Sequence, residues 1–180
     1  MSRRRAQVLD AALAVIGTAG VRGLTYQAID ARAGVPAGTT SNWFRNRAAL
    51  LHGVLAHQLD RDRAEWERFT GRPPASLGEA ADTLAALANR LSGESGERTL
   101  ARYALFLEAT THPELAGLLR EGRAAILDWG ETWLAGLGLP DPRARYRRLI
   151  GHLDGIVLHR LTFPGEPFDP EPGFRAILAD

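Results

Sequence analysis

The sequence predicts an all-α protein, and three observations support this prediction. Apolar residues recur at three- and four-residue spacing along most of the 180-residue chain, and no stretch alternates as a β-strand does. Capping residues precede these segments, and Gly or Pro follows them. Hydrophobic residues make up 45% of the chain, which is enough to build a packed core.

The first helix is expected over residues 3–17, where apolar side chains share one face. Thr25 is the expected N-cap of a second helix, Tyr26–Ala33, because its hydroxyl can accept a hydrogen bond from an otherwise unpaired backbone N–H. This second helix is short, and a turn follows it directly.

The turn Gly34-Val35-Pro36 is the most informative feature of the chain. Gly34 supplies the left-handed conformation that ends the second helix, Val35 places an apolar side chain in the corner, and Pro36 prevents the helix from continuing. A third helix is therefore expected to begin near Ala37. Two short helices joined in this way form a helix-turn-helix, which predicts DNA binding. The alternative is an ordinary helical hairpin with a tight turn.

The third helix carries small and polar residues on the side expected to face DNA. Small side chains let the backbone approach the base pairs, and hydroxyl and amide groups offer hydrogen bonds to base edges. Asn42 is suited to pair with adenine, whereas Trp43 belongs either to this surface or to the core. The predicted DNA-facing residues are Thr25, Tyr26, Ala37, Gly38, Thr39, Ser41, Asn42 and Trp43.

Positive charge concentrates at the N-terminus. Residues 1–50 carry seven Arg and two Asp, a net charge of +5, whereas residues 51–180 carry a net charge of −4. This asymmetry indicates a unit that neutralises phosphates joined to one that does not, and chance variation in surface charge is the alternative. The candidate phosphate contacts are Arg3, Arg4, Arg5, Arg45 and Arg47.

Six further helices are expected after residue 46. Asn46 is the expected cap of a long helix over residues 47–70, and Ser76 and Glu79 form a capping box that opens the next helix, which ends before Ser92. The remaining helices are expected over residues 97–111, from there to 137, over 142–162 and over 172–178.

The N-terminal part of the chain resembles the TetR family of one-component bacterial transcriptional regulators. The residues of the family pattern occur in order and at its spacing: Gly20, Leu24-Thr25, Ile29, Ala33-Gly34-Val35, Gly38-Thr39, Phe44, Arg47 and Leu50-Leu51. The family often has aromatic residues where this chain has Ser41 and Asn42, a His at Trp43 and a Lys at Arg47. Base specificity therefore does not transfer from the family to this chain.

The resemblance implies that residues 1–46 form the DNA-binding domain and residues 47–180 a ligand-binding and dimerisation domain. It implies a homodimer whose two recognition helices enter successive major grooves of a palindromic operator, and a repressor that a small-molecule ligand releases. One alternative is a regulator without a small-molecule inducer, which answers to a protein partner or activates transcription. Another is a small helical enzyme whose N-terminal unit only imitates the motif.

The resemblance also directs attention to two groups of residues in the C-terminal part. Apolar stripes on the two helices expected between residues 111 and 162 supply the candidate dimer interface, and an apolar surface with a few polar groups supplies the candidate ligand pocket. The interface residues are Ile126, Trp129, Trp133, Leu149, Leu153 and Val157, and the pocket residues are Trp66, Phe69, Tyr103, Phe106, Glu108 and Thr110. Both patterns also occur in ordinary intramolecular cores.

Several classes of site are not expected. The chain has no cysteine, which excludes disulfides and thiolate–metal sites, and its five histidines form no His-Glu-x-x-His motif. We expect no catalytic residues, no metal site and no cofactor. No apolar run approaches the ~18 residues of a membrane span, and the basic start leads into an amphipathic helix, so we expect a cytoplasmic protein.

Overall fold

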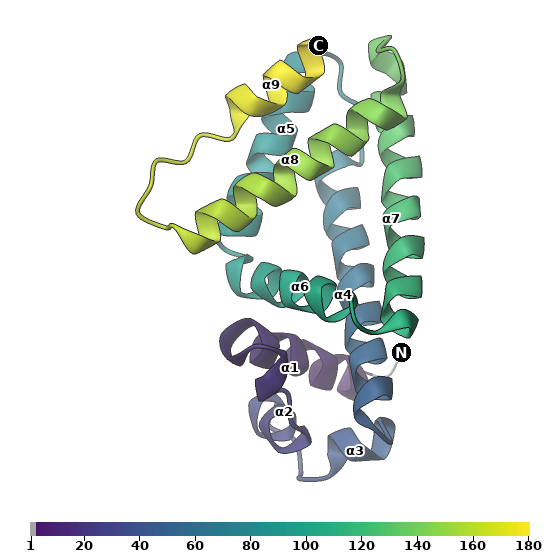
Figure 1. The fold of residues 1–180 in the computed structure, drawn as a ribbon, viewed down its shortest axis with the longest axis vertical. Helices are drawn as coiled ribbons and strands as arrows, with labels where there is room; N and C mark the ends of the chain where they lie inside the picture. The colour runs from purple at the N-terminus through teal and green to yellow at the C-terminus, as the bar shows by residue number, and fades with distance from the viewer. Residues whose placement is uncertain (1–2) are drawn as a thin grey trace. The chain divides into compact units, whose positions relative to one another are not determined.

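The computed structural model describes residues 3–180 and confirms the all-α prediction. The described residues form nine α-helices and two short 3₁₀ helices, with no strand among them (Figure 1). The α-helices are α1 (Arg3–Ala19), α2 (Tyr26–Ala33), α3 (Thr39–Trp43), α4 (Arg47–Thr70), α5 (Leu77–Ser92), α6 (Gly96–Glu108), α7 (Pro113–Leu134), α8 (Pro142–Thr162) and α9 (Glu171–Ala179).

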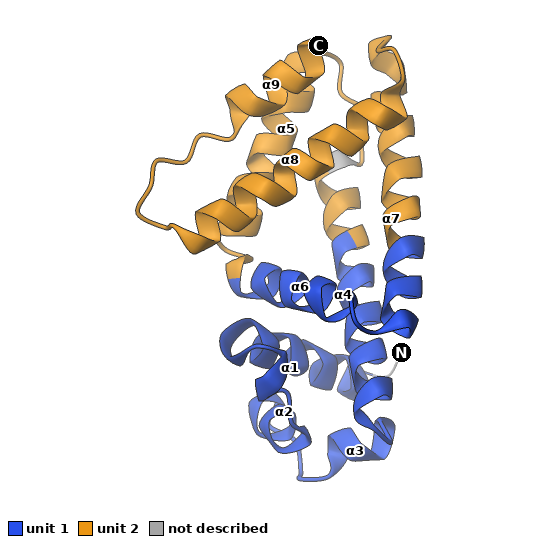
Figure 2. Cartoon of the chain, viewed as in Figure 1, with its two compact units in different colours: residues 1–62, 97–121 blue, residues 63–96, 122–180 orange. Residues whose placement is uncertain are grey.

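The chain divides into two compact units, which Figure 2 shows in different colours. Unit 1 consists of residues 1–62 and 97–121, and unit 2 consists of residues 63–96 and 122–180. The long helix α4 begins in unit 1 and ends in unit 2. The boundaries between the compact units therefore do not coincide with the predicted domain boundary at residue 46. A functional boundary at that residue stays a prediction.

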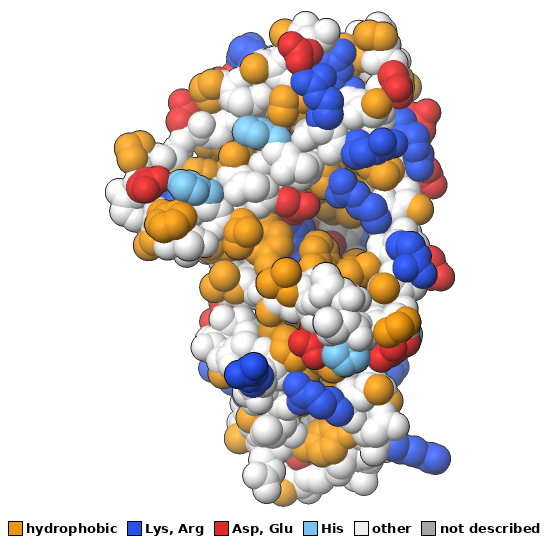
Figure 3. Space-filling view, viewed as in Figure 1, with side chains coloured by type: hydrophobic (Ala, Val, Ile, Leu, Met, Phe, Trp, Pro, Cys, Tyr) orange, Lys and Arg blue, Asp and Glu red, His pale blue; other side chains and the backbone are white. Residues whose placement is uncertain are grey.

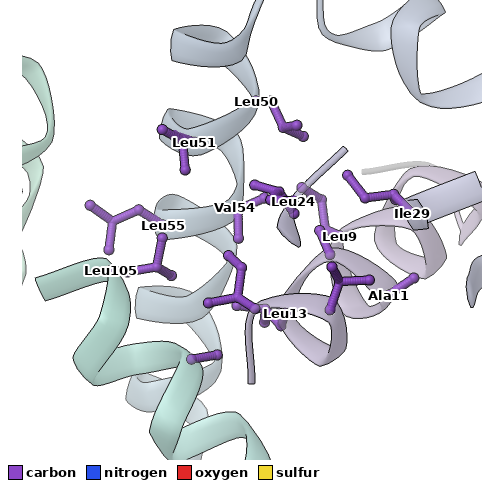
Figure 4. Close-up of a cluster of buried hydrophobic side chains, with 14 of the residues drawn as sticks. Leu9, Ala11, Leu13, Leu24, Ile29, Leu50, Leu51, Val54, Leu55 and Leu105 are labelled. Atoms are coloured by element: carbon purple, nitrogen blue, oxygen red, sulfur yellow. The ribbon is translucent and has the colours of Figure 1, made fainter. Parts of the chain in front are cut away.

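The core of unit 1 is built from α1, α2, the first turns of α4, α6 and the start of α7. Leucine and isoleucine side chains from these elements and from the segment before α2 meet in one cluster (Figure 4). Leu24, Ile29, Phe44 and Leu50, which also belong to the family pattern, are buried in it. Each such side chain contributes about 1.5–3 kcal/mol when it leaves water. This cluster holds the helix-turn-helix on a rigid support.

The core of unit 2 combines a helical layer with an aromatic cluster. Helices α5, α8 and α9 pack against one another (Figure 1). The ring of Tyr146 lies 6.1 Å from those of Trp66 and Trp129 and 6.5 Å from that of Trp133, measured between centroids. Burial raises the pKa of the Tyr146 phenol, which keeps it neutral. Trp66, Trp133 and Tyr146 are buried, and with the half-buried Trp129 their rings form the aromatic part of this core.

The helix starts follow the predicted caps. The backbone N–H of Ala28 donates to the Thr25 hydroxyl, that of Ala49 to the Asn46 amide, and that of Glu79 to the Ser76 hydroxyl. The carboxylate of Glu79 accepts from the N–H of Ala75, one residue before the partner that a capping box predicts.

Several helix boundaries differ from the predictions. A 3₁₀ helix, Val21–Gly23, precedes α2, and another, Ala135–Leu137, follows α7. Helix α6 ends at Glu108 rather than at residue 111. The hydroxyls of Thr110 and Thr111 donate to the carbonyls of Leu107 and Glu108 and so compete with the helical pattern, and Pro113 then begins α7.

None of the helices, within the described part of the chain, has the length and apolar character needed to cross a bilayer.

Gly130 on α7 allows the ring of Tyr146 to lie directly against the helix backbone. A methyl group at Gly130 would come within 1.9–2.2 Å of three atoms of that ring. We expect Gly130→Ala to lower the free energy of unfolding by about 1–3 kcal/mol, because the ring must move out of its packed position. Urea unfolding measures this change.

Gly136→Ala is the matched control, because a methyl group at Gly136 meets no atom within 4 Å. The control should change stability by no more than about 0.5 kcal/mol. Equal stability of the two variants would show that the Gly130 contact is not tight in solution.

Candidate nucleic-acid interface

The predicted turn between α2 and α3 is present. Gly34 has φ 64° and ψ 36°, the left-handed conformation that ends α2. Its N–H donates to the carbonyl of Ala31 at 3.2 Å, and the N–H of Val35 donates to that of Asp30 at 3.1 Å. Val35 is partly buried against the core of unit 1, as its role in the corner requires. The helix-turn-helix is thus formed by the residues that predicted it.

Helix α3 begins at Thr39, two residues after the predicted start at Ala37. Gly38 has φ 87°, which a right-handed helix cannot contain, and the N–H of Thr39 closes a turn on the carbonyl of Pro36 at 3.1 Å. Ala37 and Gly38 are therefore exposed turn residues at the N-terminal end of α3.

The exposed side of α3 carries the predicted polar groups. Asn42 and Ser41 are exposed, and the Ser41 hydroxyl donates to the carbonyl of Gly38 at 2.9 Å. The Thr39 hydroxyl likewise donates to the carbonyl of Pro36 at 2.6 Å, so each of these two hydroxyl oxygens can still accept a hydrogen bond. Trp43 is half-buried and packs against the core of unit 1. Asn42 therefore offers the amide donor and acceptor of this surface.

Asp30 on α2 is a feature that sequence reasoning missed. Its carboxylate is buried and accepts hydrogen bonds from the N–H groups of Gly38 and Thr40 at 2.8 and 2.9 Å. The Thr40 hydroxyl donates to it at 2.5 Å. A signal was available, because helical spacing places this acid on the same face of α2 as the buried Ile29 and Ala33.

Arg47 at the start of α4 is attached to the segment before α2. Its guanidinium donates from Nη1 to the carbonyl of Leu24 at 2.9 Å and from Nη2 to that of Val21 at 2.7 Å. The sequence suggested only a phosphate contact for this side chain, whereas the structure gives it an internal anchoring role as well. The side chain remains exposed, so the predicted phosphate contact stays a prediction.

A surface hollow of about 390 Å³ joins the start of α2 to the start of α4. It brings together four of the predicted DNA-binding residues, Thr25, Tyr26, Arg45 and Arg47, and its remaining lining is Leu24, Asn46 and Leu50. Two guanidinium groups and a helix N-terminus at one hollow suit a phosphate group.

The basic N-terminal residues lie at the start of α1. Arg3 and Arg4 are exposed. Arg5 is half-buried, and its guanidinium carbon lies 5.5 Å from the centroid of the Phe44 ring, which is within cation–π range. Arg5 therefore supports the packing of Phe44 at the end of α3.

The predicted pocket residues fall in both units. In unit 2, Trp66 is buried in the aromatic cluster, and Phe69 is half-buried with the Arg90 guanidinium 5.9 Å from its ring. In unit 1, the rings of Tyr103 and Phe106 are 6.4 Å apart on α6. Glu108 is half-buried and Thr110 is exposed. A ligand contact for these residues stays a prediction.

Four of the six predicted dimer-interface residues are buried within the single chain. Trp133, Leu149, Leu153 and Val157 are at most 3% exposed within the single chain. Side chains already buried in their own protomer have no surface left to bury against a partner, so these four belong to the core of unit 2. Ile126 and Trp129 are half-buried.

The exposed side of α8 carries basic side chains, whereas its inward side is mostly apolar. Basic side chains gather over its N-terminal half in the face drawn in Figure 3. Arg143 pairs with Asp128 and Glu131, and Arg148 pairs with Asp180. Much of this positive charge is therefore neutralised by neighbouring acids within unit 2.

Comparisons with known proteins agree with this geometry. Residues 8–54 match bacterial regulatory proteins of the tetR family, and residues 75–180 match the tetracyclin repressor-like C-terminal domain. The HTH-type transcriptional regulator BetI of Paraburkholderia xenovorans (strain LB400) is 28% identical over 179 residues, which cover 96% of this chain and 88% of BetI.

Two solved structures are similar over nearly the whole chain. A member of the TetR family from Streptomyces coelicolor A3 has a TM-score of 0.69 and 30% identity, over 99% of this chain and 97% of that chain. The multidrug binding protein EbrR complexed with ethidium has a TM-score of 0.71 and 28% identity, over 98% of this chain and 97% of that chain.

The effect of the two hydrogen bonds of Arg47 can be measured separately from the effect of its charge. We expect Arg47→Lys to lower the free energy of unfolding by about 1 kcal/mol, because an ammonium group cannot reach both carbonyls as the guanidinium fork does. The slope of log binding constant against log salt concentration should stay unchanged, since the charge is kept.

Arg47→Ala removes both the fork and the charge. It should also destabilise the protein. It should make the dependence of log binding constant on log salt concentration less steep, by about the amount that one phosphate contact contributes. Urea unfolding and DNA binding at several salt concentrations measure the two effects. Wild-type stability of Arg47→Lys would contradict the anchoring role.

Proposed function

This chain belongs to the TetR family of helix-turn-helix transcriptional regulators, and we propose that it represses transcription from a palindromic operator until a small-molecule ligand releases it. One observation above all supports the DNA-binding part of this proposal. The exposed Ser41 and Asn42 of α3 belong to the same compact unit as the hollow that Arg45 and Arg47 line. Base-reading and phosphate-binding groups thus occur together on one helix-turn-helix.

The two sets of groups have different tasks in the proposed complex. The side chain of Asn42 meets base edges in the major groove, where an amide can bind adenine with two hydrogen bonds. A backbone phosphate enters the hollow between the starts of α2 and α4, where Arg45 and the α2 N-terminus meet its charge. The phosphate contact sets the register, and the α3 side chains select the sequence.

We propose that a small molecule binds in the C-terminal part of the chain. EbrR is described as a multidrug binding protein and has been crystallised with ethidium, and it is similar to this chain over its C-terminal part as well. Phe69, Tyr103, Phe106, Glu108 and Thr110 remain our candidates for contacts with this ligand. Trp66 is buried among the rings of unit 2, so we do not include it among these contacts.

Helix α4 is a continuous stretch of chain that runs from the proposed DNA-binding surface into unit 2. It starts with Arg47 in the DNA-binding surface and continues without a break to Thr70. A ligand can release the operator only if it binds the released state more tightly than the DNA-bound state. We propose that the ligand acts by shifting this helix, and with it the anchor that Arg47 makes to Leu24 and Val21. Because the proposed target is operator DNA, we also propose that the protein is cytoplasmic.

We propose a homodimer that forms through the exposed face of α8. Methyl groups at Gly151 and Gly155 would meet no atom within 4 Å, and the neighbouring Leu158 is 47% exposed. Two copies of such a face can approach closely about a two-fold axis, and each contact then occurs twice. Four of the residues first expected at the interface are buried within the single chain, so the proposal rests on this exposed face instead.

The DNA-binding proposal is tested with the full-length protein and the DNA upstream of its own gene. We expect binding of this DNA at low ionic strength, and release when a ligand found by thermal-shift screening is added. Asn42→Ala should change the ranking of related DNA sequences, because the amide is the proposed base reader. Electrophoretic mobility shift or fluorescence anisotropy measures these effects. Failure to bind the upstream DNA would refute the proposal, and binding that no ligand relieves would refute its inducer part.

The proposed dimer face is tested by a charged side chain at its centre. Gly155→Glu should convert the protein to a monomer, because two like charges would meet across the two-fold axis. Analytical ultracentrifugation measures the mass, and circular dichroism checks that the helices persist. Gly136→Glu is the control, since it adds the same charge at another open glycine. A Gly155→Glu dimer as stable as the control would place the interface elsewhere.

A further inference from the structure

The recognition helix α3 lacks the means to hold itself in place. It has five residues, Thr39–Trp43, and its N-cap residue Gly38 has no side chain to accept the free N–H groups of the first turn. Isolated helices shorter than about 12 residues are marginal in water even when their sequences are rich in alanine. The orientation of α3 must therefore come from contacts with the rest of unit 1.

The carboxylate of Asp30 provides the missing cap from a neighbouring helix. Its Oδ2 accepts the N–H of Gly38, and its Oδ1 accepts both the N–H and the hydroxyl of Thr40. The three donor–acceptor distances are 2.8, 2.9 and 2.5 Å. Because one oxygen binds Gly38 just before α3 and the other binds Thr40 inside it, the carboxylate restrains the direction of the helix as well as its start.

This contact is buried and depends on the charge of Asp30. The Asp30 residue is 4% exposed and Thr40 is fully buried. Burial alone would raise the pKa of Asp30, but the hydroxyl and N–H of Thr40 and the N–H groups of Gly38 and Thr39 bind the ionised form and hold the pKa below its ordinary value. The contribution to stability is therefore complete at neutral pH, and it is lost only as the pH falls through this lowered pKa.

We propose that Asp30 is a positioning residue for DNA recognition: by capping α3 from α2, its carboxylate sets the orientation in which Asn42 and Ser41 meet the operator. Asp30 itself touches no DNA in this proposal, because its oxygens are occupied by α3 and are shielded from solvent. The inference rests on DNA binding by the helix-turn-helix and is independent of any ligand.

The positioning role and simple electrostatics predict opposite changes in operator affinity when the charge of Asp30 is removed. Removing a negative charge from a DNA-binding unit strengthens its attraction to phosphates, so electrostatics alone predicts tighter binding to every DNA. Loss of the cap releases α3, which weakens binding to the operator, where base contacts matter, and leaves non-specific binding nearly unchanged.

The experiment compares Asp30→Asn with Asp60→Asn in the full-length protein. Asp60 lies exposed on α4 in the same unit, so the control makes the same change of charge at the surface. Binding is measured at one salt concentration to upstream DNA and to a scrambled duplex of equal length. We expect Asp30→Asn to weaken binding to upstream DNA by about tenfold, as the loss of one charged hydrogen-bonded contact implies, and to change binding to the scrambled duplex by less than about twofold.

The control should bind both duplexes within about twofold of the wild type, since it lacks a structural contact. Equal affinity of the two Asn variants for upstream DNA would overturn the proposal. A wild-type protein that ignores upstream DNA would instead refute the proposed function, so the two failures are distinguishable. Hydrogen exchange at the N–H groups of Gly38 and Thr40 should become faster in Asp30→Asn and remain slow in Asp60→Asn.

A second pair of variants keeps the test decisive if Asp30→Asn does not fold. Thr40→Ser keeps the hydroxyl that donates to Asp30, whereas Thr40→Val removes it with little change of volume. Thr40→Val should lose affinity for upstream DNA relative to Thr40→Ser and keep its affinity for the scrambled duplex. Global unfolding would lower both affinities together. Equal behaviour of the Ser and Val variants on upstream DNA would overturn the proposal.

Discussion

Attachment of a five-residue helix to its neighbours is the constraint on which DNA recognition by this protein depends. Helix α3 is too short to persist by itself, so its position is set at both ends by other elements. The Asp30 carboxylate holds the start, and the buried ring of Phe44 holds the end. The exposed groups between these two points, Ser41 and Asn42, inherit their geometry from that attachment.

The support for this helix is the apolar cluster of unit 1, to which α4 also belongs. The guanidinium of Arg47 joins the start of α4 to the carbonyls of Val21 and Leu24, just before α2. The first turn of α4 is therefore connected to the helix-turn-helix by hydrogen bonds as well as by packing. In a ligand-responsive regulator, a movement of α4 would reach the DNA-binding surface through these same bonds.

In unit 2, a stripe of apolar residues on a helix did not indicate whether the stripe packs within its own chain or against a second copy. Trp133, Leu149, Leu153 and Val157 lie at helical spacing, and they face the core of their own chain. The open face of α8 contains two glycines and Leu158 instead. Small residues on an exposed helix face carry almost no hydrophobic signal in a sequence, although they allow a close approach between helices.

The sequence by itself determined the family, the helical class and most helix boundaries, because Thr25, Gly34, Asn46 and Ser76 act on backbone groups only a few residues away. Only the tertiary structure decided which elements cover each apolar face, and it alone revealed the roles of Asp30 and Arg47. Their hydrogen bonds reach partners 8 to 26 residues away. Such contacts depend on how the helices pack, which local spacing does not encode.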